Sequence, residues 1–182
     1  NRQFLKEPSA PMKQHRNLII TIVITLSTLI AISVVAHAEQ DKLLGEFRDW
    51  IAVSFVENGN LNCYIVSQPK KEKGKYTQRG PAYVQVTLRH GAESAVVSFQ
   101  AGYRFQETSE VHVQIDGDTQ ALFTQSEMAW TYPGEDKMLI DSMRQGKRMI
   151  VMGTSWRGTE TTDTYSLYGF TKAYNELLHS CS

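Results

Sequence analysis

One stretch of the sequence carries side chains of the kinds that bind metal ions. In VHVQIDGD, the residues His112, Gln114, Asp116 and Asp118 occupy every second position. A strand running through all four would place them on one face, where imidazole and carboxylate groups suit zinc or a similar ion. Asp116 and Gly117, however, form a strong hairpin-turn signal that would redirect the chain before Asp118. We therefore expect a solvent-facing histidine, turn aspartates, and no metal or other cofactor.

The two cysteines leave three options open, namely metal ligands, a nucleophile or a disulfide. Neither Cys63 nor Cys181 has flanking basic residues or a second cysteine at C-x-x-C spacing, the features that lower a thiol pKa. A serine nucleophile has no better support, because the chain lacks G-x-S-x-G and the serines of GTSW and TYSL lie in strand-like runs. The sequence predicts no catalytic residue, so we expect a protein that is not an enzyme.

The N-terminal part of the chain is typical of an export signal. Lys13 and Arg16 precede an apolar run over residues 18–35. Ala36 and Ala38 then supply the small side chains that signal peptidase requires. We expect residues 1–11 to be an upstream extension, 12–38 a signal peptide and 39–182 a single exported domain.

A signal anchor retained in the inner membrane is the alternative, because the apolar run approaches the roughly 18 residues of a spanning helix. In both cases the basic flank stays inside and the chain from Glu39 onward is exported. The expected location is the periplasm, the outer membrane or the exterior of the cell.

The net charge of the expected exported part, residues 39–182, limits the classes of partner that it could bind. Four basic residues and one acidic residue precede Glu39, so the remainder carries a net charge of about −3. This charge argues against nucleic acid as a partner. Residues 39–182 are long enough for one domain with a hydrophobic core. Both cysteines lie in this part, and an oxidising compartment lets thiols pair, so we expect a disulfide.

The hydrophobic pattern is mostly that of β-strands. Residues 50–56 alternate, and after Asn58 and Gly59 the run LNCYIVS alternates again, which predicts a hairpin. Further strand candidates are residues 83–88, 95–100, 111–115, 121–123, 128–132, 148–155 and 162–168. The pattern predicts an all-β fold, an antiparallel β-sandwich or barrel of about eight to ten short strands.

Two segments have helical periodicity instead. Residues 135–145 begin with two acidic residues and end before Gly146, as expected of a short helix with a glycine after its last turn. Near the C-terminus, apolar residues recur at steps of three and four and form one stripe: Phe170, Ala173, Tyr174, Leu177, Leu178 and Cys181. The stripe predicts a C-terminal helix that points Cys181 inward.

Two surface features are candidates for partner contact. The segment KKEKGK follows Pro69 and contributes Lys70, Lys71, Lys73 and Lys75 to what we expect to be a solvated hairpin loop. Such a loop could contact anionic lipid or glycan at a membrane surface. The loops at residues 68–79 and 102–110 are the expected contact regions.

Several runs together resemble the invasion-associated locus B (IalB) family, small exported proteins of alphaproteobacteria. These runs are GEFRDW, CYIVSQ, QIDGD, GKRM and SLYGFTKAY before a terminal cysteine. Signature positions, interpreted as structural, are Asp49, Trp50, Cys63, Gln68, Gly169, Phe170 and Cys181.

The resemblance implies an all-β envelope-associated or secreted domain, linked in some pathogens to host-cell invasion, with no established catalytic residues. Family members often have more cysteines, and here Ser54 stands where a partner for Cys63 would be expected. Cys181 is then the partner that remains for Cys63.

Two functions follow from these observations. The first is a non-enzymatic exported interaction or virulence-associated factor that contacts a host-cell or envelope component and aids attachment, invasion or survival. The second is a periplasmic barrel that binds a small hydrophobic ligand, for which Trp50, Trp130 and Trp156 could line a pocket as well as a core.

Overall fold

A computed structural model of the chain describes residues 41–181. The chain divides into two units, Asn1–Ala38 and Glu39–Ser182, and the described residues belong to the second. The expected extension at 1–11, the signal peptide at 12–38 and the cleavage before Glu39 lie outside the described residues and stay predictions.

The domain is one antiparallel sheet of eleven strands with two helices. The strands are β1 (Lys42–Phe47), β2 (Trp50–Glu57), β3 (Asn60–Ser67), β4 (Lys71–Gly74), β5 (Tyr83–Leu88), β6 (Val96–Gln100), β7 (Glu110–Ile115), β8 (Asp118–Gln125), β9 (Met128–Thr131), β10 (Arg148–Thr154) and β11 (Glu160–Ser166). The helices are α2 (Asp136–Gln145) and α3 (Phe170–Cys181). This architecture confirms the predicted all-β fold with a short helix and a C-terminal helix.

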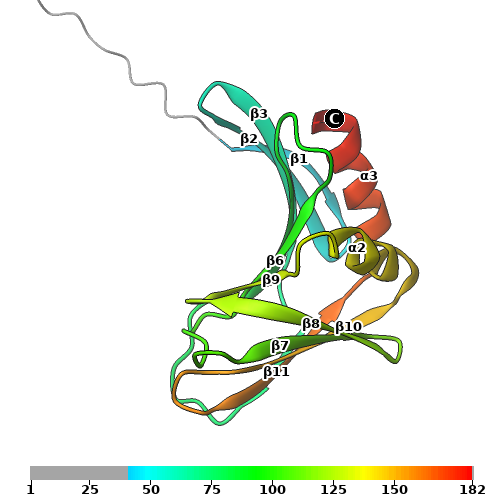
Figure 1. Cartoon of the computed structure of the whole chain (residues 1–182). Coiled ribbons are helices and arrows are strands. Elements are labelled where there is room, and N and C mark those ends of the chain that lie inside the picture. Colours follow the sequence, from blue (N-terminus) through cyan, green and yellow to red (C-terminus); the bar gives the residue numbers. More distant parts are fainter. Residues whose placement is uncertain (1–40, 182) are drawn as a thin grey trace, which may run out of the picture. The chain divides into compact units, whose positions relative to one another are not determined.

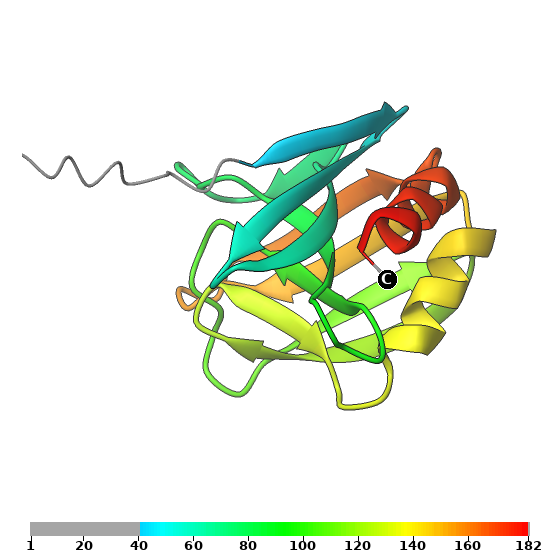
Figure 2. The same cartoon turned by 90° about the horizontal axis from the view of Figure 1, so that it is seen from above.

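The strand order places the two unpaired edges of the sheet at β1 and β4. The order is β1-β2-β3-β5-β6-β9-β8-β7-β10-β11-β4. Figures 1 and 2 show the sheet bending beyond β6, so that its two halves face each other as in a sandwich. Phe99 of β6 meets Tyr165 of β11 across this interior, with ring centroids 6.5 Å apart. The cavity between these residues measures about 10 Å³, so side chains fill the interior.

The predicted hairpin is formed by β2 and β3. Asn58 and Gly59 have φ values of 54° and 77°, the left-handed conformation that a two-residue turn between twisted strands requires. Trp50, Ala52 and Ser54 face the core, whereas Ile51 is 40% exposed. Ser54 lies directly opposite Cys63 in the strand register.

The two helices follow the predicted stripes. In α3, Phe170, Ala173 and Leu177 are buried, and the helix packs on β1, β2 and β3 (Figure 1). In α2, Leu139, Ile140 and Met143 are buried. Gly146 ends α2 as expected, but its φ of −76° is open to any residue. Glycine is needed there because a Cβ would overlap the side chain of Ile115.

Two strands were not expected from the sequence, and one of them corrects a prediction. Residues 70–75 are exposed as expected, but they are not a loop, because Lys71–Gly74 form strand β4 and pair with β11. Lys70 precedes the strand, and its backbone N–H donates to the carbonyl of Thr164 over 2.7 Å. The other unexpected strand is β1, whose pairing with β2 shifts register between Leu43 and Gly45.

No helix among residues 41–181 has the length and apolar character needed to cross a membrane.

Candidate binding site

Cys63 and Cys181 form a disulfide, which is the pairing predicted above. Their Cα atoms are 5.9 Å apart, and the bond joins β3 to the last turn of α3. Cys63 is fully buried. Both cysteines are therefore occupied, and the described domain has no free thiol to act as nucleophile or metal ligand.

Three of the signature residues meet where α3 begins. The ring of Phe170 packs edge-on against Trp50, with centroids 4.9 Å apart. Trp50 Nε1 donates to the carbonyl of Ser166 over 3.0 Å. Gly169 has a φ of 97°, and a Cβ at this position would overlap the carbonyl oxygen of Phe47. This close approach fixes the start of α3 against β1 and β2.

Asp49 and Gln68 lie together at the start of β2 and the end of β3. The carboxylate of Asp49 is 2.6 Å from Lys70 Nζ, and hydrogen bonds from Lys70 and Ser166 hold its pKa below the ordinary value. Ser67 Oγ donates to the Asp49 carbonyl over 2.6 Å. Gln68, Asp49 and Lys70 line one shallow cavity of about 430 Å³.

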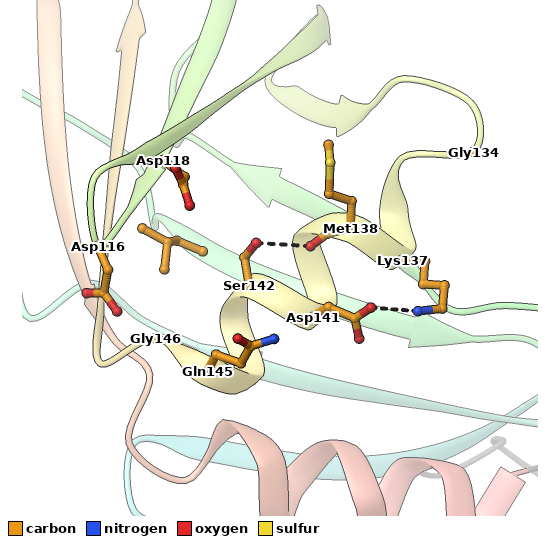
Figure 3. A pocket seen from close by; sticks show the side chains of 10 residues that line it. Asp116, Asp118, Gly134, Lys137, Met138, Asp141, Ser142, Gln145 and Gly146 are labelled. Carbon is orange, nitrogen blue, oxygen red and sulfur yellow. Dashed lines mark hydrogen bonds and ion pairs between the residues drawn. The ribbon is translucent and has the colours of Figure 1, made fainter.

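A turn separates His112 and Gln114 from Asp118, the residues that the sequence offered as a metal-site candidate. Asp116 and Gly117 have φ values of 49° and 111° and form the turn between β7 and β8. Figure 3 shows Asp116 and Asp118 beside α2, whereas the carboxylate of Asp141 turns away towards Lys137. Asp116, Asp118 and Asp141 line a cavity of about 590 Å³. His112 is exposed on β7 and does not line that cavity. Among residues 41–181, no three His, Cys, Asp or Glu side chains are grouped to hold a metal ion.

A buried ion pair between Arg79 and Asp163 lies behind the edge strand β4. Arg79 Nη1 and Nη2 donate to the two carboxylate oxygens of Asp163 over 2.7 and 2.6 Å. Arg79 Nε donates to the carbonyl of Ala101 over 2.7 Å. The side chains are 3% and 6% exposed, so neither ion has much contact with water. The sequence placed Arg79 in an exposed contact loop, and this expectation is wrong for its side chain.

Aromatic rings and charges around Arg79 favour its cationic form. Burial alone would lower the pKa of the guanidinium, but hydrogen bonding and attraction from Asp163 outweigh burial and raise it. The guanidinium carbon lies 5.1 Å from the ring centroid of Tyr103 and 5.7 Å from that of Tyr76. Tyr103 and Thr161 share a hydrogen bond of 2.6 Å, and burial raises the tyrosine pKa. The polar atoms of the ion pair therefore find their hydrogen-bond partners within the domain, and Arg79 lines a neighbouring cavity.

That cavity, called here the Trp156 cavity, has a volume of about 560 Å³. Its lining comes from three segments: Lys75, Tyr76, Thr77, Gln78, Arg79 and Gly80; Gly102 and Tyr103; and Ser155, Trp156, Arg157, Thr159 and Thr161. Apart from Gly80, the first two segments belong to the two predicted contact loops, at 68–79 and 102–110. Gly80 N–H donates to the carbonyl of Gly102 over 2.9 Å, which brings those loops together.

For the third segment, the sequence named only Trp156, as one of three tryptophans that could line a pocket or a core. Trp156 is 58% exposed, and Arg157 lies over its ring at 4.7 Å from the centroid. The only local signal was an aromatic residue followed by Arg157 and Gly158 after a strand candidate. In the other two segments, Arg79 is 84 residues from its partner Asp163, and Tyr103 is 58 residues from its partner Thr161. No local pattern in the sequence connects such distant residues.

Lysines of β4 form a second exposed feature beside this cavity. Lys71 and Lys73 pair with Thr164 and Thr162 of β11, while Glu72 pairs with Asp163. Because side chains alternate along a strand, Lys71 and Lys73 lie on the face opposite to the buried Asp163. Both are exposed, and neither is in an ion pair with another residue of the described domain. Lys70 differs, because it binds Asp49.

The family model for "Invasion associated locus B (IalB) protein" matches residues 50–178. The chain belongs to this family. A solved structure with the same fold is that of invasion associated protein B from Bartonella henselae. It is 16% identical, with a TM-score of 0.55, and the match covers 74% of this chain and 94% of that chain. No curated protein sequence matches the chain significantly.

Membership of the IalB family agrees with the resemblance found in the sequence, and the matched region begins at Trp50 and includes α2 and most of α3. Trp50, Phe170 and Cys63 lie within the matched residues, whereas Cys181 lies just beyond them. The Trp156 cavity and β4 also lie within the matched residues.

Proposed function

We propose that this IalB family protein is an exported, non-enzymatic interaction protein that aids attachment to, entry into or survival in a host cell. Its contact surface is the basic edge of the sheet at β4, and its partner is an anionic component of the envelope or of the host surface. The invasion-associated family supports the biological role. The proposal depends on export through residues 12–38, for which N-terminal sequencing of the mature protein should give Glu39 as the first residue.

The observation that carries the proposal is the pair of exposed, unpaired lysines on β4. The exported part has a net charge of about −3, so a local excess of lysine is not a property of the whole surface. Lysines on an edge strand also discourage pairing with strands of other molecules, and this protective role explains part of the lysine content of β4. Lys71 and Lys73 place unpaired positive charge at the edge of the sheet, where it can contact an anionic surface.

Features of the described domain support a role without catalysis. Both cysteines are bonded to each other, and Arg79 and Asp163 satisfy each other in the interior. The aspartates near α2 lie at a turn and in an exposed ion pair. These contacts give the cysteines, Arg79, Asp163 and Asp141 structural roles.

The test replaces Lys71 and Lys73 by glutamine. Exchange of the whole 70–75 segment would remove β4 and the Lys70 contact with Asp49, so it would confuse folding with binding. The variant Lys71→Gln/Lys73→Gln keeps the strand and removes two charges. We expect export and melting temperature to stay unchanged, and association with host cells or anionic vesicles to weaken, with the difference shrinking as salt is raised.

A matched control replaces two exposed lysines of other elements, Lys42 on β1 and Lys172 on α3. Lys42→Gln/Lys172→Gln removes the same charge. Equal loss of association in both variants would show that net charge alone matters and would refute a contact at β4. A hydrolytic activity abolished by one Ser or His substitution would refute the non-enzymatic function.

A second candidate function is binding of a small hydrophobic ligand. The interior of the sheet is filled, so the ligand would occupy a surface groove of about 830 Å³ between α3, α2 and the β5–β6 connection. Apolar residues supply much of its lining, among them Leu61, Leu88, Ile140 and Leu178. Native mass spectrometry of protein purified from its own compartment tests this function, because a carrier should retain a bound ligand.

A further inference from the structure

We propose that the Trp156 cavity binds an acidic pyranose, a sugar ring that carries a carboxylate, presented as part of an oligosaccharide. This inference rests on the proposed function, because it names the chemical class of the anionic partner. It is carried by three properties of the cavity, namely exposed aromatic rings, an excess of positive charge and neutral polar side chains.

Two aromatic rings reach the surface at this cavity. Trp156 is 58% exposed and Tyr76 is 37% exposed, although both are large apolar side chains. Exposed rings offer flat faces against which the C–H face of a pyranose can pack, and burial of that face removes apolar surface from water. The C–H groups of a sugar are slightly positive, so they also suit the negative face of a ring.

The segment that carries Trp156 is held by backbone hydrogen bonds. The Trp156 N–H donates to the carbonyl of Arg104 over 2.8 Å, and the Ser155 N–H donates to that of Thr159 over 2.9 Å. Thr159 N–H also donates to Ser155 Oγ over 3.2 Å. A backbone fixed in this way loses little conformational entropy when a ligand binds.

Positive charge dominates the cavity. Lys75, Arg79 and Arg157 line it, and no Asp or Glu is among its lining residues, although the exported part as a whole is acidic. Arg79 is occupied by Asp163 and Glu72, whereas Lys75 and Arg157 are in no ion pair of the described domain, although Arg157 lies over the Trp156 ring. A sugar carboxylate would accept charge-assisted hydrogen bonds from these two side chains.

Neutral polar groups complete the site. Thr77, Gln78 and Thr159 provide hydroxyl and amide groups that can donate to and accept from sugar hydroxyls. A simple inorganic anion would leave the aromatic rings unused, and an apolar ligand would leave Lys75 and Arg157 without a partner. The combination therefore favours a ligand with a carboxylate, a ring face and hydroxyl groups.

The test follows the indole signals of the three tryptophans by NMR in the disulfide-bonded exported protein. Trp156→Phe assigns the Trp156 signal, and the buried Trp50 serves as an internal control. The probes are 3′-sialyllactose and trigalacturonate, with lactose and methyl-esterified trigalacturonate as their neutral counterparts. We expect both acidic sugars to shift the Trp156 signal and to bind about tenfold more tightly than the neutral sugars, the effect of one charge-assisted hydrogen bond.

A charge variant gives a second readout. Arg157→Gln should weaken binding of the acidic sugars about tenfold. Lys172→Gln removes an exposed charge on α3 and should leave binding unchanged. Because Arg157 and Trp156 are exposed, their substitution should not prevent folding.

Three results would overturn the inference. They are an unchanged Trp156 signal with both acidic sugars, an equal response to the neutral sugars, and the same response to acetate or phosphate at equal concentration. Lys71 and Lys73 do not line the cavity, so loss of cell association in their variant without sugar binding would support the β4 surface and refute this inference alone.

Discussion

Arg79 and Asp163 are 84 positions apart in the sequence and form a two-fold hydrogen-bonded ion pair in the interior of the domain. The pair connects the segment after β4 to β11, directly behind the basic edge of the sheet. Because Arg79 also binds the carbonyl of Ala101, it holds the start of the second contact loop. The pair thus joins the segments that form the Trp156 cavity.

The first prediction concerns the free energy of unfolding of variants of this pair. Arg79→Met leaves the Asp163 carboxylate buried without its cation, and loss of one partner of a buried ion pair costs about 3 to 5 kcal/mol. The double variant Arg79→Met/Asp163→Asn should be more stable than the single variant Arg79→Met. Guanidinium denaturation of the wild type, both single variants and the double variant measures the coupling.

An exposed ion pair gives the control for the first prediction. Lys137 and Asp141 of α2 have side chains that are 81% and 43% exposed. Lys137→Gln should cost no more than about 0.5 kcal/mol, as is usual for a surface pair in a helix. Strict additivity of Arg79→Met and Asp163→Asn would show that the buried pair is not coupled.

The pattern of residues within a short stretch of sequence was sufficient to predict those parts of the fold that depend on contacts between residues close in sequence. Asn58 and Gly59 specify the β2–β3 turn, and the stripe from Phe170 to Cys181 specifies the buried face of α3. The disulfide was predicted because the expected export favours thiol pairing and Cys181 is the only other cysteine in the sequence.

The missed features depend on contacts between distant residues. Lys71–Gly74 has the composition of a loop, and only pairing with β11 makes it a strand, so tertiary context overrides intrinsic propensity there. The sequence of strand β1, KLLGEF, lacks clean alternation, and its register with β2 shifts between Leu43 and Gly45. Arg79 lies in a polar connection after β4 and its partner Asp163 lies in β11, so its burial had no sequence signal.

The second prediction concerns the disulfide. In the chain-entropy model, a cross-link between residues separated by 118 positions stabilises the fold by about 4 to 5 kcal/mol, as an upper value. Cys63→Ser and Cys181→Ser should lower the melting temperature by similar amounts, and the double variant should cost little more than one substitution. Labelling of the folded, oxidised protein that finds two reactive thiols would contradict the bond.

The third prediction separates steric overlap from backbone strain at two glycines. Gly169 and Gly158 both have positive φ, at 97° and 77°. A Cβ at Gly169 overlaps the carbonyl of Phe47, whereas a Cβ at Gly158 has no atom within 4 Å. Gly158→Ala should cost about 1 to 2 kcal/mol from the left-handed conformation. Gly169→Ala should cost about 1 to 3 kcal/mol more, the range for an overfilled site. Equal melting temperatures of the two variants would show that the Phe47 contact relaxes freely.

The last prediction concerns the pH dependence of stability at Asp49. Hydrogen bonds from Lys70 and Ser166 lower the pKa of Asp49 in the folded state. A group with a depressed pKa stabilises the folded state above its unfolded pKa, about 3.9 for aspartate, and this contribution is lost as pH falls through the folded pKa. Lys70→Gln should therefore raise the pKa of Asp49, measured from the ¹³C shift of its carboxyl group. The variant should be less stable than the wild type at pH 7 and equal to it in strong acid.

Lys71→Gln is the control for the Lys70→Gln experiment. Lys71 is the next residue in the sequence but belongs to no ion pair of the described domain. This variant removes the same charge and should leave the Asp49 titration close to that of the wild type. An equal rise in the Asp49 pKa for both variants would mean that the general positive field of the lysines, and not the 2.6 Å contact with Lys70, sets the titration. That result would also weaken the structural role of Asp49 as the group that holds Lys70 at the start of β4, since Lys70 would then be as free as Lys71.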